Sequence, residues 1–240
     1  MNLFRKDREW LKRNFLKIWK KITKRKVWWG NLRSTKPFSR VFGYDRGNQS
    51  IARYYIDNFI FSCKADIKGN ILEIGDDTYT KKFGTKIKKS DVLHVTSGNS
   101  KATIVADLTI DQSIPSGTYD CIIMTQTLPF IYNIKAALKN TYRILKPGGT
   151  LLVTLSGISQ VSRYDMDRWG EYWRFTSLSA KKLFEEFFPP ENIKVEAFGN
   201  LLAAVALLEG LASCELRKKE LDINDPDYEV IITVRAIKPL

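Results

Sequence analysis

The chain has 240 residues, enough for one α/β domain with a full core and an additional arm. Hydrophobic residues make up 44% and charged residues 27% of it, and no apolar run reaches the roughly 18 residues of a membrane-spanning helix. No apolar core of a secretory signal is present, and three cysteines without CxxC spacing beside a single histidine exclude a disulfide framework, a zinc site and a His-rich metal site.

The net charge of +13 is distributed unevenly along the chain. Residues 1–30 contain eleven Lys or Arg side chains and only two acidic ones, Asp7 and Glu9. The other 210 residues therefore carry a net charge of only about +4. The basic character belongs to an N-terminal arm and not to the rest of the chain.

The arm is predicted to form one basic amphipathic helix over residues 3–26. Its apolar residues recur at spacings of seven, four, three and four: Phe4, Leu11, Phe15, Ile18 and Ile22. Such a helix suits an anionic membrane surface or the groove of a partner protein such as a glycosyltransferase. Equally, its apolar face can pack on the chain's own domain. Nucleic acid is a less favoured partner, because charge alone is nonspecific and no binding motif accompanies it.

Breaks at Pro37, Gly43 and Gly47 predict a linker over residues 27–47. The chain is therefore expected to divide into an arm with its linker, residues 1–47, and a domain, residues 48–240. The domain is predicted to begin with a helix that ends near Ser62.

From Asn70 onward, short apolar runs alternate with helical segments. The predicted strands cover residues 71–74, 91–95, 102–106, 119–124, 150–155, 192–198 and 228–236, and the predicted helices cover residues 133–145, 178–187 and 200–213. Near-continuous apolar strands separated by helices indicate a parallel sheet that is covered on both faces. We expect a Rossmann-like, doubly wound, mostly parallel seven-stranded sheet with helices on both faces. The apolar run at 201–208 is predicted as a core helix, and a lipid-facing role is the less favoured interpretation.

Ligands of open parallel sheets bind beyond the carboxyl ends of the strands, where residues 73–75 (Glu-Ile-Gly) end the first strand. That segment, Asp107, residues 119–123 and the Arg-Ile-Leu-Lys-Pro-Gly-Gly segment at 143–149 together resemble class I S-adenosylmethionine-dependent methyltransferases that act on small molecules. The resemblance runs from about residue 69 to the end. More narrowly, residues 43–47, 90–94 and 169–176 resemble bacterial methyltransferase domains associated with glycosyltransferases in surface-polysaccharide synthesis.

The resemblance implies a set of cofactor-binding residues. Around S-adenosylmethionine it implies Glu73, Gly75 and Asp76 beside the methionine and ribose, Thr96 at the ribose hydroxyls, Asp107 and Leu108 at the adenine, and Thr125 and Gln126 at the methyl-transfer pocket. Two features depart from the family pattern. The usual glycine-rich loop keeps only Gly75, and Thr96 stands where a ribose-binding carboxylate is expected. The two aspartates that follow Gly75 suit a cationic sulfonium and would repel a pyrophosphate, which argues against a dinucleotide dehydrogenase.

The segment from Gly157 to Thr176 is polar and aromatic, and it begins at the carboxyl end of a strand. We expect it to overhang the site, with Asp165 as the general base and with Tyr164, Trp173 and Arg174 at the acceptor. The alternative is a lid held together by surface ion pairs and buried tryptophans. Gln126 is a further candidate catalytic residue, and Arg46 a further substrate contact or a surface charge.

His94 is predicted to be a core histidine. The Asn/Asp-Pro-Pro-aromatic motif of many amino-group methyltransferases is absent after the fourth strand, which favours an oxygen acceptor. We therefore expect a cytoplasmic methyltransferase, peripheral at the inner membrane surface through its arm, that modifies a hydroxyl of a glycan or related small molecule. The alternatives are a catalytically silent scaffold in a glycan-assembly complex and, third, a nucleic-acid methyltransferase.

Overall fold

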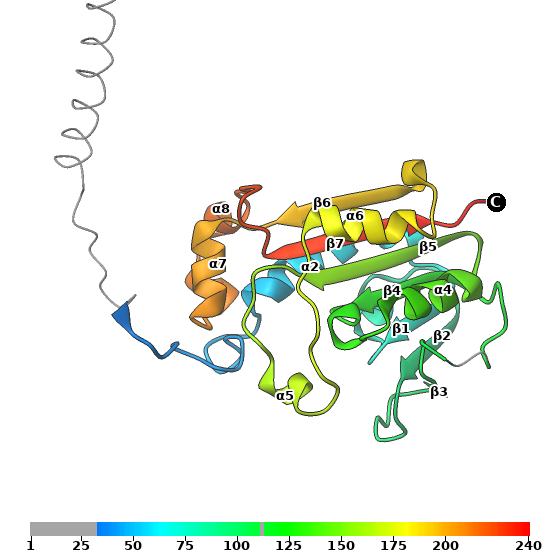
Figure 1. Cartoon of the computed structure of the whole chain (residues 1–240), viewed down its shortest axis with the longest axis horizontal. Coiled ribbons are helices and arrows are strands. Elements are labelled where there is room, and N and C mark those ends of the chain that lie inside the picture. The colour runs from blue at the N-terminus through cyan, green and yellow to red at the C-terminus, as the bar shows by residue number, and fades with distance from the viewer. Residues whose placement is uncertain (1–32, 111–112) are drawn as a thin grey trace, which may run out of the picture. The chain divides into compact units, whose positions relative to one another are not determined.

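The computed structural model describes residues 33–110 and 113–240, so the helix predicted over residues 3–26 lies outside the described residues. Residues from Pro37 to Leu240 form one unit around a seven-stranded sheet (Figure 1). Its strands are β1 (Gly69–Ile74), β2 (Ile87–His94), β3 (Ile104–Val105), β4 (Tyr119–Thr125), β5 (Leu145–Ser156), β6 (Ile193–Phe198) and β7 (Ile231–Ile237). The strand order is β3-β2-β1-β4-β5-β7-β6.

The first five strands in sequence pair in parallel, whereas β7 runs antiparallel to both β5 and β6. This arrangement confirms the predicted mostly parallel, doubly wound sheet. The strand order reverses between β1 and β4, so the carboxyl ends of these two strands diverge to form the crevice in which such sheets bind ligands.

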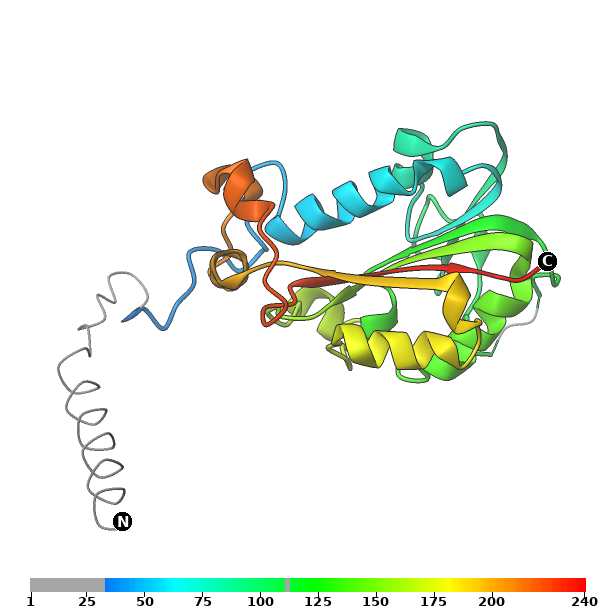
Figure 2. The same cartoon turned by 90° about the horizontal axis from the view of Figure 1, so that it is seen from above.

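Helices cover both faces of the sheet (Figure 2). The helices are α2 (Ile51–Ser62), α3 (Thr78–Phe83), α4 (Ile134–Ile144), α5 (Arg163–Met166), α6 (Ser177–Glu185), α7 (Leu201–Leu208) and α8 (Lys218–Leu221). Alternate strand residues point to opposite faces, so Leu72 and Ile122 pack with α4 and α6, while Ile71 and Ile123 pack with α2 and α7. This two-sided burial explains why the inner strands read as continuous apolar runs.

Side-chain caps determine where the predicted helices begin. The side chains of Ser50, Asn133 and Asn200 each accept a hydrogen bond from a backbone N–H in the first turn of α2, α4 and α7. Thr176 and Ser179 form a reciprocal capping box at α6. The predicted starts of α4, α6 and α7 lie within one residue of the observed ones.

Several predicted boundaries were wrong. Only two residues of β3 pair with β2, because a turn at residues 99–102 takes up the start of the predicted strand. The predicted helix 200–213 ends at Leu208, since the backbone N–H of Gly210 bonds Leu207 at a positive φ of 71°. A Cβ on Gly210 would lie 2.2 Å from the Ser39 carbonyl oxygen, so this close approach requires glycine.

The segment 37–47, predicted as a linker, contacts α7 through a hydrogen bond of 3.1 Å from the Ser39 N–H to the Glu209 carbonyl. Within the described ranges, no helix is long and apolar enough to cross a membrane.

Candidate active site

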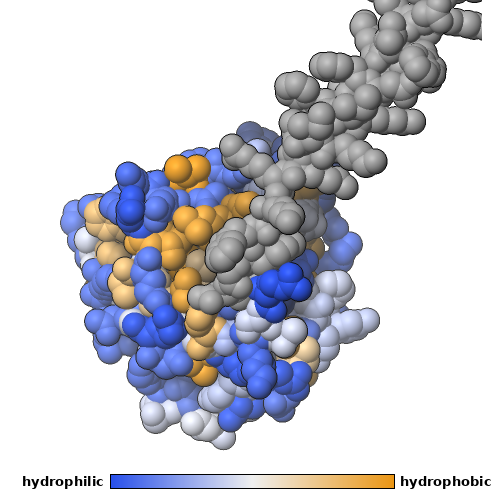
Figure 3. All heavy atoms as spheres, turned by 90° about the vertical axis from the view of Figure 1, so that its left-hand side faces the viewer, coloured by the Kyte–Doolittle hydropathy of each residue, from blue (hydrophilic) through white to orange (hydrophobic). Residues whose placement is uncertain are grey.

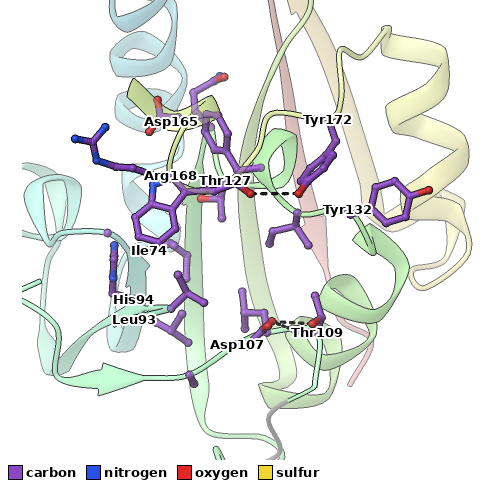
Figure 4. A pocket seen from close by; sticks show the side chains of 18 of the residues that line it. Ile74, Leu93, His94, Asp107, Thr109, Thr127, Tyr132, Asp165, Arg168 and Tyr172 are labelled. Carbon is purple, nitrogen blue, oxygen red and sulfur yellow. Dashed lines mark hydrogen bonds between the residues drawn. The ribbon is translucent and has the colours of Figure 1, made fainter. Parts of the chain in front are cut away.

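A cavity of about 630 Å³ opens at the carboxyl ends of β1, β2 and β4 (Figure 4). Strand ends supply Ile74, Gly75, Leu93, His94, Thr125 and Gln126 to its wall. Asp107 and Thr109 lie at one end of the cavity, and Asp165 and Tyr172 lie at the other. The cavity thus has two chemically different ends joined by the apolar floor of the crevice.

The loop after β1 leaves free space beside Gly75, and the carboxylate of Glu73 holds the helix that follows the loop. Gly75 has a positive φ of 90°, and a Cβ built there would meet no atom within 4 Å, so the glycine borders free space. Glu73 does not line the cavity. Its buried carboxylate accepts hydrogen bonds of 2.8–2.9 Å from the backbone N–H groups of Tyr79 and Thr80 and from the Thr80 hydroxyl. Burial raises the pKa of Glu73, partly offset by these hydrogen bonds, and the carboxylate fixes the start of α3.

A side pocket of about 370 Å³ shares Gly75 and Thr125 with the main cavity. Arg53, from the first turn of α2, donates to the Tyr79 hydroxyl over 2.6 Å. The Tyr79 hydroxyl in turn donates to Asp57 over 2.8 Å, and burial raises its pKa, so it stays protonated. Among the described residues, the half-buried Arg53 guanidinium has no carboxylate partner.

Asp76 lines the side pocket and faces the same space as Arg53. Its Oδ1 accepts the Thr78 backbone N–H over 3.0 Å, and Oδ2 lies 3.8 Å from Lys101 Nζ. Burial would raise the pKa of Asp76, but the Thr78 hydrogen bonds, Lys101 and Arg53 together lower it. The Asp76 carboxylate is therefore ionised in the same pocket as Arg53, although the two side chains form no ion pair.

Asp107 follows β3 and lines the main cavity with Leu108 and Thr109. Asp107 Oδ1 accepts both the backbone N–H and the hydroxyl of Thr109, over 2.7 and 2.8 Å. Asn140 from α4 donates to the Leu108 carbonyl over 2.8 Å, which fixes the backbone of this loop. The Asp107 carboxylate is thus oriented by its own loop at one end of the cavity.

The end of β2 differs from the sequence-based expectation. Thr96 is exposed and does not line the cavity, whereas His94 and Val95 do. The prediction of a core His94 was wrong, because its ring lies edge-on to Trp169 at 5.5 Å between centroids, in the cavity wall. The backbone N–H of Thr96 donates to His94 Nδ1 over 3.2 Å, so Thr96 is held against the histidine and outside the cavity.

Thr125 ends β4 and lines both cavities, and Gln126, which follows it, lines the main cavity. Gln126 has a positive φ of 51°, a strained conformation for a non-glycine residue. Its side chain reaches β5, where Nε2 donates to the Thr154 hydroxyl over 3.3 Å and Oε1 accepts from the Ser156 hydroxyl. Gln126 is therefore a fixed group in the cavity wall.

The segment after β5 overhangs the cavity, as predicted from its position. Asp165 on α5 lines the cavity, and its Oδ2 accepts the Ser162 hydroxyl over 2.6 Å. Tyr172 ties this segment to the turn after β4, because its backbone N–H donates to the Pro129 carbonyl over 2.8 Å. Tyr164 points elsewhere: it is 66% exposed and stacks with Arg168, 3.6 Å from ring centroid to guanidinium carbon.

Trp173 and Arg174 line a second groove of about 650 Å³, and Tyr132 belongs to both the groove and the main cavity. The rings of Tyr132 and Trp173 stack at 6.0 Å, and Trp173 Nε1 donates to the Ile131 carbonyl over 3.0 Å. Arg174 pairs with the buried Glu171 at 2.6 Å. The groove therefore continues the cavity along an aromatic wall.

Arg46 lies apart from the cavity and the groove. It pairs with Glu215 at 2.5 Å and stacks on Phe38, and the Glu215 hydrogen bond raises its pKa. In the described part of the chain, no group of three His, Cys, Asp or Glu residues could hold a metal ion.

Sequence reasoning missed Arg53, Asp57 and Tyr79. The one available signal for Arg53 was a lone cation near the start of a predicted helix that precedes the first strand. The sequence contains no comparable signal for Tyr79, whose role depends on the path of the loop after Gly75.

The comparisons with known proteins agree with this geometry. A family model described as a methyltransferase domain matches residues 28–197. The N-methyltransferase NodS from Bradyrhizobium japonicum WM9, solved with S-adenosyl-L-homocysteine, superposes with a TM-score of 0.50 at 14% identity, over 85% of this chain and 95% of NodS. A SAM-dependent methyltransferase from Archaeoglobus fulgidus gives a TM-score of 0.47 at 14% identity, over 78% of this chain and 90% of that protein. No curated protein matches the chain.

The family model covers well over half of the chain, and the strand order and the crevice at the ends of β1 and β4 are those of the same fold. The chain therefore belongs to the methyltransferase-domain family, and it is a class I S-adenosylmethionine-dependent methyltransferase.

Proposed function

We propose that the chain transfers the methyl group to a hydroxyl of a glycan or a related small molecule. The observation that carries this proposal is the acceptor end of the cavity, where the Asp165 carboxylate stands among the aromatic rings of Trp169 and Tyr172. Aromatic faces stack on the apolar faces of sugar rings, and a carboxylate binds hydroxyls. The groove lined by Trp173 and Tyr132 offers further aromatic faces, on which a second sugar ring of the acceptor could stack.

The residues around the cavity fit S-adenosylmethionine, which supplies an electrophilic methyl group when bound. Asp107 and the backbone of Leu108 would hold the adenine, and the open space at Gly75 admits the chain of the cofactor. Arg53 would bind the methionine carboxylate, because it is a half-buried cation without a described anionic partner. Asp76 would bind the ammonium group.

At the acceptor end, Asp165 would accept the hydroxyl proton, a contribution of roughly 10²–10⁴-fold for general-base catalysis. The fixed side chain of Gln126 would orient the acceptor beside Thr125. Holding nucleophile and donor in line is worth about 7–11 kcal/mol of the barrier, so most of the rate enhancement would come from positioning. Trp173 and Arg174 would bind the acceptor beyond its reacting ring, in the groove.

An oxygen acceptor is favoured by the residues that follow β4. Thr125-Gln126-Thr127 stands where many amino-group methyltransferases have Asn/Asp-Pro-Pro-aromatic. NodS is an N-methyltransferase by its title, but at 14% identity it bears on the fold alone.

A catalytically silent scaffold is the second candidate, supported by the outward-facing Thr96. The end of β2 presents His94 and no carboxylate to the cavity, so one usual ribose contact is missing. Cofactor binding distinguishes the two functions, because a silent scaffold has no requirement for it.

The experiment is methyl transfer from isotope-labelled S-adenosylmethionine to a panel of mono- and oligosaccharides, with product mapped by mass spectrometry. Asp165→Asn should lower the transfer rate at least about a hundredfold and leave binding of S-adenosylhomocysteine within twofold. Asp167→Asn, two residues away, exposed and paired with Arg163, is the matched control and should change neither. Equal rates for Asp165→Asn and wild type would refute the assignment of the base, and methylation of amines but not hydroxyls would refute the acceptor class.

A further inference from the structure

Helix α7 exposes three of its four leucines to solvent, whereas Leu207 and the alanines face the core. Ala203, Ala204 and Ala206 are buried, whereas Leu201, Leu202 and Leu208 are 43–54% exposed. A surface helix ordinarily buries its leucines, and a helix that is apolar all round meets an apolar environment on both sides. Leu201 and Leu208 are seven residues apart and therefore share one exposed face.

Other apolar side chains extend this face. Figure 3 shows apolar residues gathered in one band on the side of the molecule that carries α7. We use the name α7 patch for the exposed residues Phe38, Val41, Val161, Leu201, Leu202 and Leu208. None of these six residues lines the cavity or the groove described above.

Two hydrogen bonds assemble the α7 patch from three separate segments. The Ser39 N–H donates to the Glu209 carbonyl over 3.1 Å, which brings Phe38 and Val41 to the end of α7. Gln160 Nε2 donates to the Arg40 carbonyl over 3.2 Å, which brings Val161 to the same segment. The absence of a side chain at Gly210 permits this approach, as described above. The patch is therefore a built part of the fold, and contiguous exposed apolar surface of this kind marks an interaction site.

Positive charge accompanies the α7 patch. Arg40 stands between Ser39 and Val41, is exposed, and forms no ion pair with any residue of the described ranges. Upstream in the sequence, thirteen of residues 1–36 are Lys or Arg and two are acidic. An exposed apolar surface with Arg40 in it, in a chain whose preceding sequence is strongly basic, matches an anionic bilayer, in which leucines enter the headgroup–acyl boundary and cations meet phosphates.

We propose that the α7 patch docks the protein on an anionic membrane surface. The proposal does not depend on the acceptor chemistry proposed above. Val161 directly precedes Ser162, the N-cap residue of α5. Docking would therefore bring the first residue of the helix that carries Asp165 close to the lipid surface.

The test is sedimentation of the full chain with vesicles of phosphatidylcholine that contain phosphatidylglycerol. The triple variant Leu201→Gln/Leu202→Gln/Leu208→Gln should lower the partition coefficient by roughly tenfold or more, because it removes the apolar contribution and leaves the charges in place. The control is Leu178→Gln on α6, which is 65% exposed and outside the patch, and should partition as wild type. Binding of S-adenosylhomocysteine reports that each variant is folded, and Val41→Gln/Val161→Gln provides a second variant outside α7.

Each outcome decides the proposal. Reduced partitioning of both patch variants, with the control unchanged, supports it. Wild-type partitioning of the patch variants, or no binding of wild type to these vesicles, overturns it. A wild-type dimer in sedimentation equilibrium that the triple variant lacks also overturns it, because the patch then contacts a second copy of the chain.

Discussion

Replacing Arg53 by Met tests the cofactor side pocket. The substitution keeps most of the apolar stem of the side chain and removes a cation that lies beside Gly75 and Asp76 and has no described carboxylate partner. A hydrogen bond to a charged group contributes about 1.5–3 kcal/mol, so we expect the dissociation constant of S-adenosylhomocysteine to rise roughly ten- to hundredfold. The loss should be confined to ligands that carry the methionine carboxylate.

The assay is calorimetric titration with two ligands. S-adenosylhomocysteine contains the carboxylate, and 5′-methylthioadenosine contains the adenosine but no amino-acid group. Arg53→Met should weaken binding of the first ligand and leave binding of the second within twofold. Arg46→Met is the matched control, since Arg46 pairs with Glu215 outside the cavity, and both ligands should bind it as they bind wild type. Equal weakening of both ligands by Arg53→Met would show that Arg53 acts on the fold of the loop and would refute its assignment to the carboxylate.

Three further predictions concern the loop, the sheet and the groove. Glu73→Gln should lower the free energy of unfolding by about 1–3 kcal/mol, because an amide nitrogen then faces a buried backbone N–H. Urea unfolding measures this change, and unchanged stability would contradict the role of Glu73 in holding the start of α3. Burial would raise the pKa of Asp120, but hydrogen bonds from the Asn70 N–H and Lys146 lower it overall. The ionised Asp120 therefore stabilises the fold above its ordinary pKa near 3.8, and this stabilisation is lost as the pH falls through the lower pKa of the folded state. Asp120→Asn should therefore be less stable than wild type at pH 7, with the gap in urea midpoint closing below about pH 4, and a constant gap contradicts the sign. Trp173→Ala should raise the acceptor KM roughly tenfold at unchanged cofactor affinity, whereas Tyr164→Ala, which removes an exposed ring outside the cavity, should not.

The fold was accessible from the sequence because its strands are buried on both faces and its main helices carry side-chain caps. The inner strands β1, β4 and β5 read as apolar runs, and Ser50, Asn133 and Asn200 fix helix starts that a polar residue before an apolar segment already indicates. The three short helices α3, α5 and α8 were not predicted. They have four to six residues, too few for an apolar period to appear.

The candidate site was predictable where the backbone alone determines position. Gly75, Asp107, Leu108, Thr125 and Gln126 line the cavity because each stands at or just after the carboxyl end of a strand. Sequence position says less about side-chain direction.

Residues whose direction depends on loops or distant partners were placed less well. Thr96 turns outward after β2, and Tyr164 leaves the cavity on a four-residue helix. Arg46 is drawn to Glu215, a partner 169 residues away that no local pattern reveals. The same limit hid Arg53, which is held at the side pocket by its hydrogen bond to Tyr79, 26 residues later in the chain.

The most direct test of the account is calorimetric titration of the full chain with S-adenosylmethionine and S-adenosylhomocysteine, repeated with Asp107→Ala. The cavity at the ends of β1, β2 and β4 predicts one micromolar site in the wild type, and Asp107→Ala should abolish it while leaving the unfolding midpoint close to that of wild type. Absence of binding of either ligand to the folded wild-type protein would contradict the account and favour a silent scaffold.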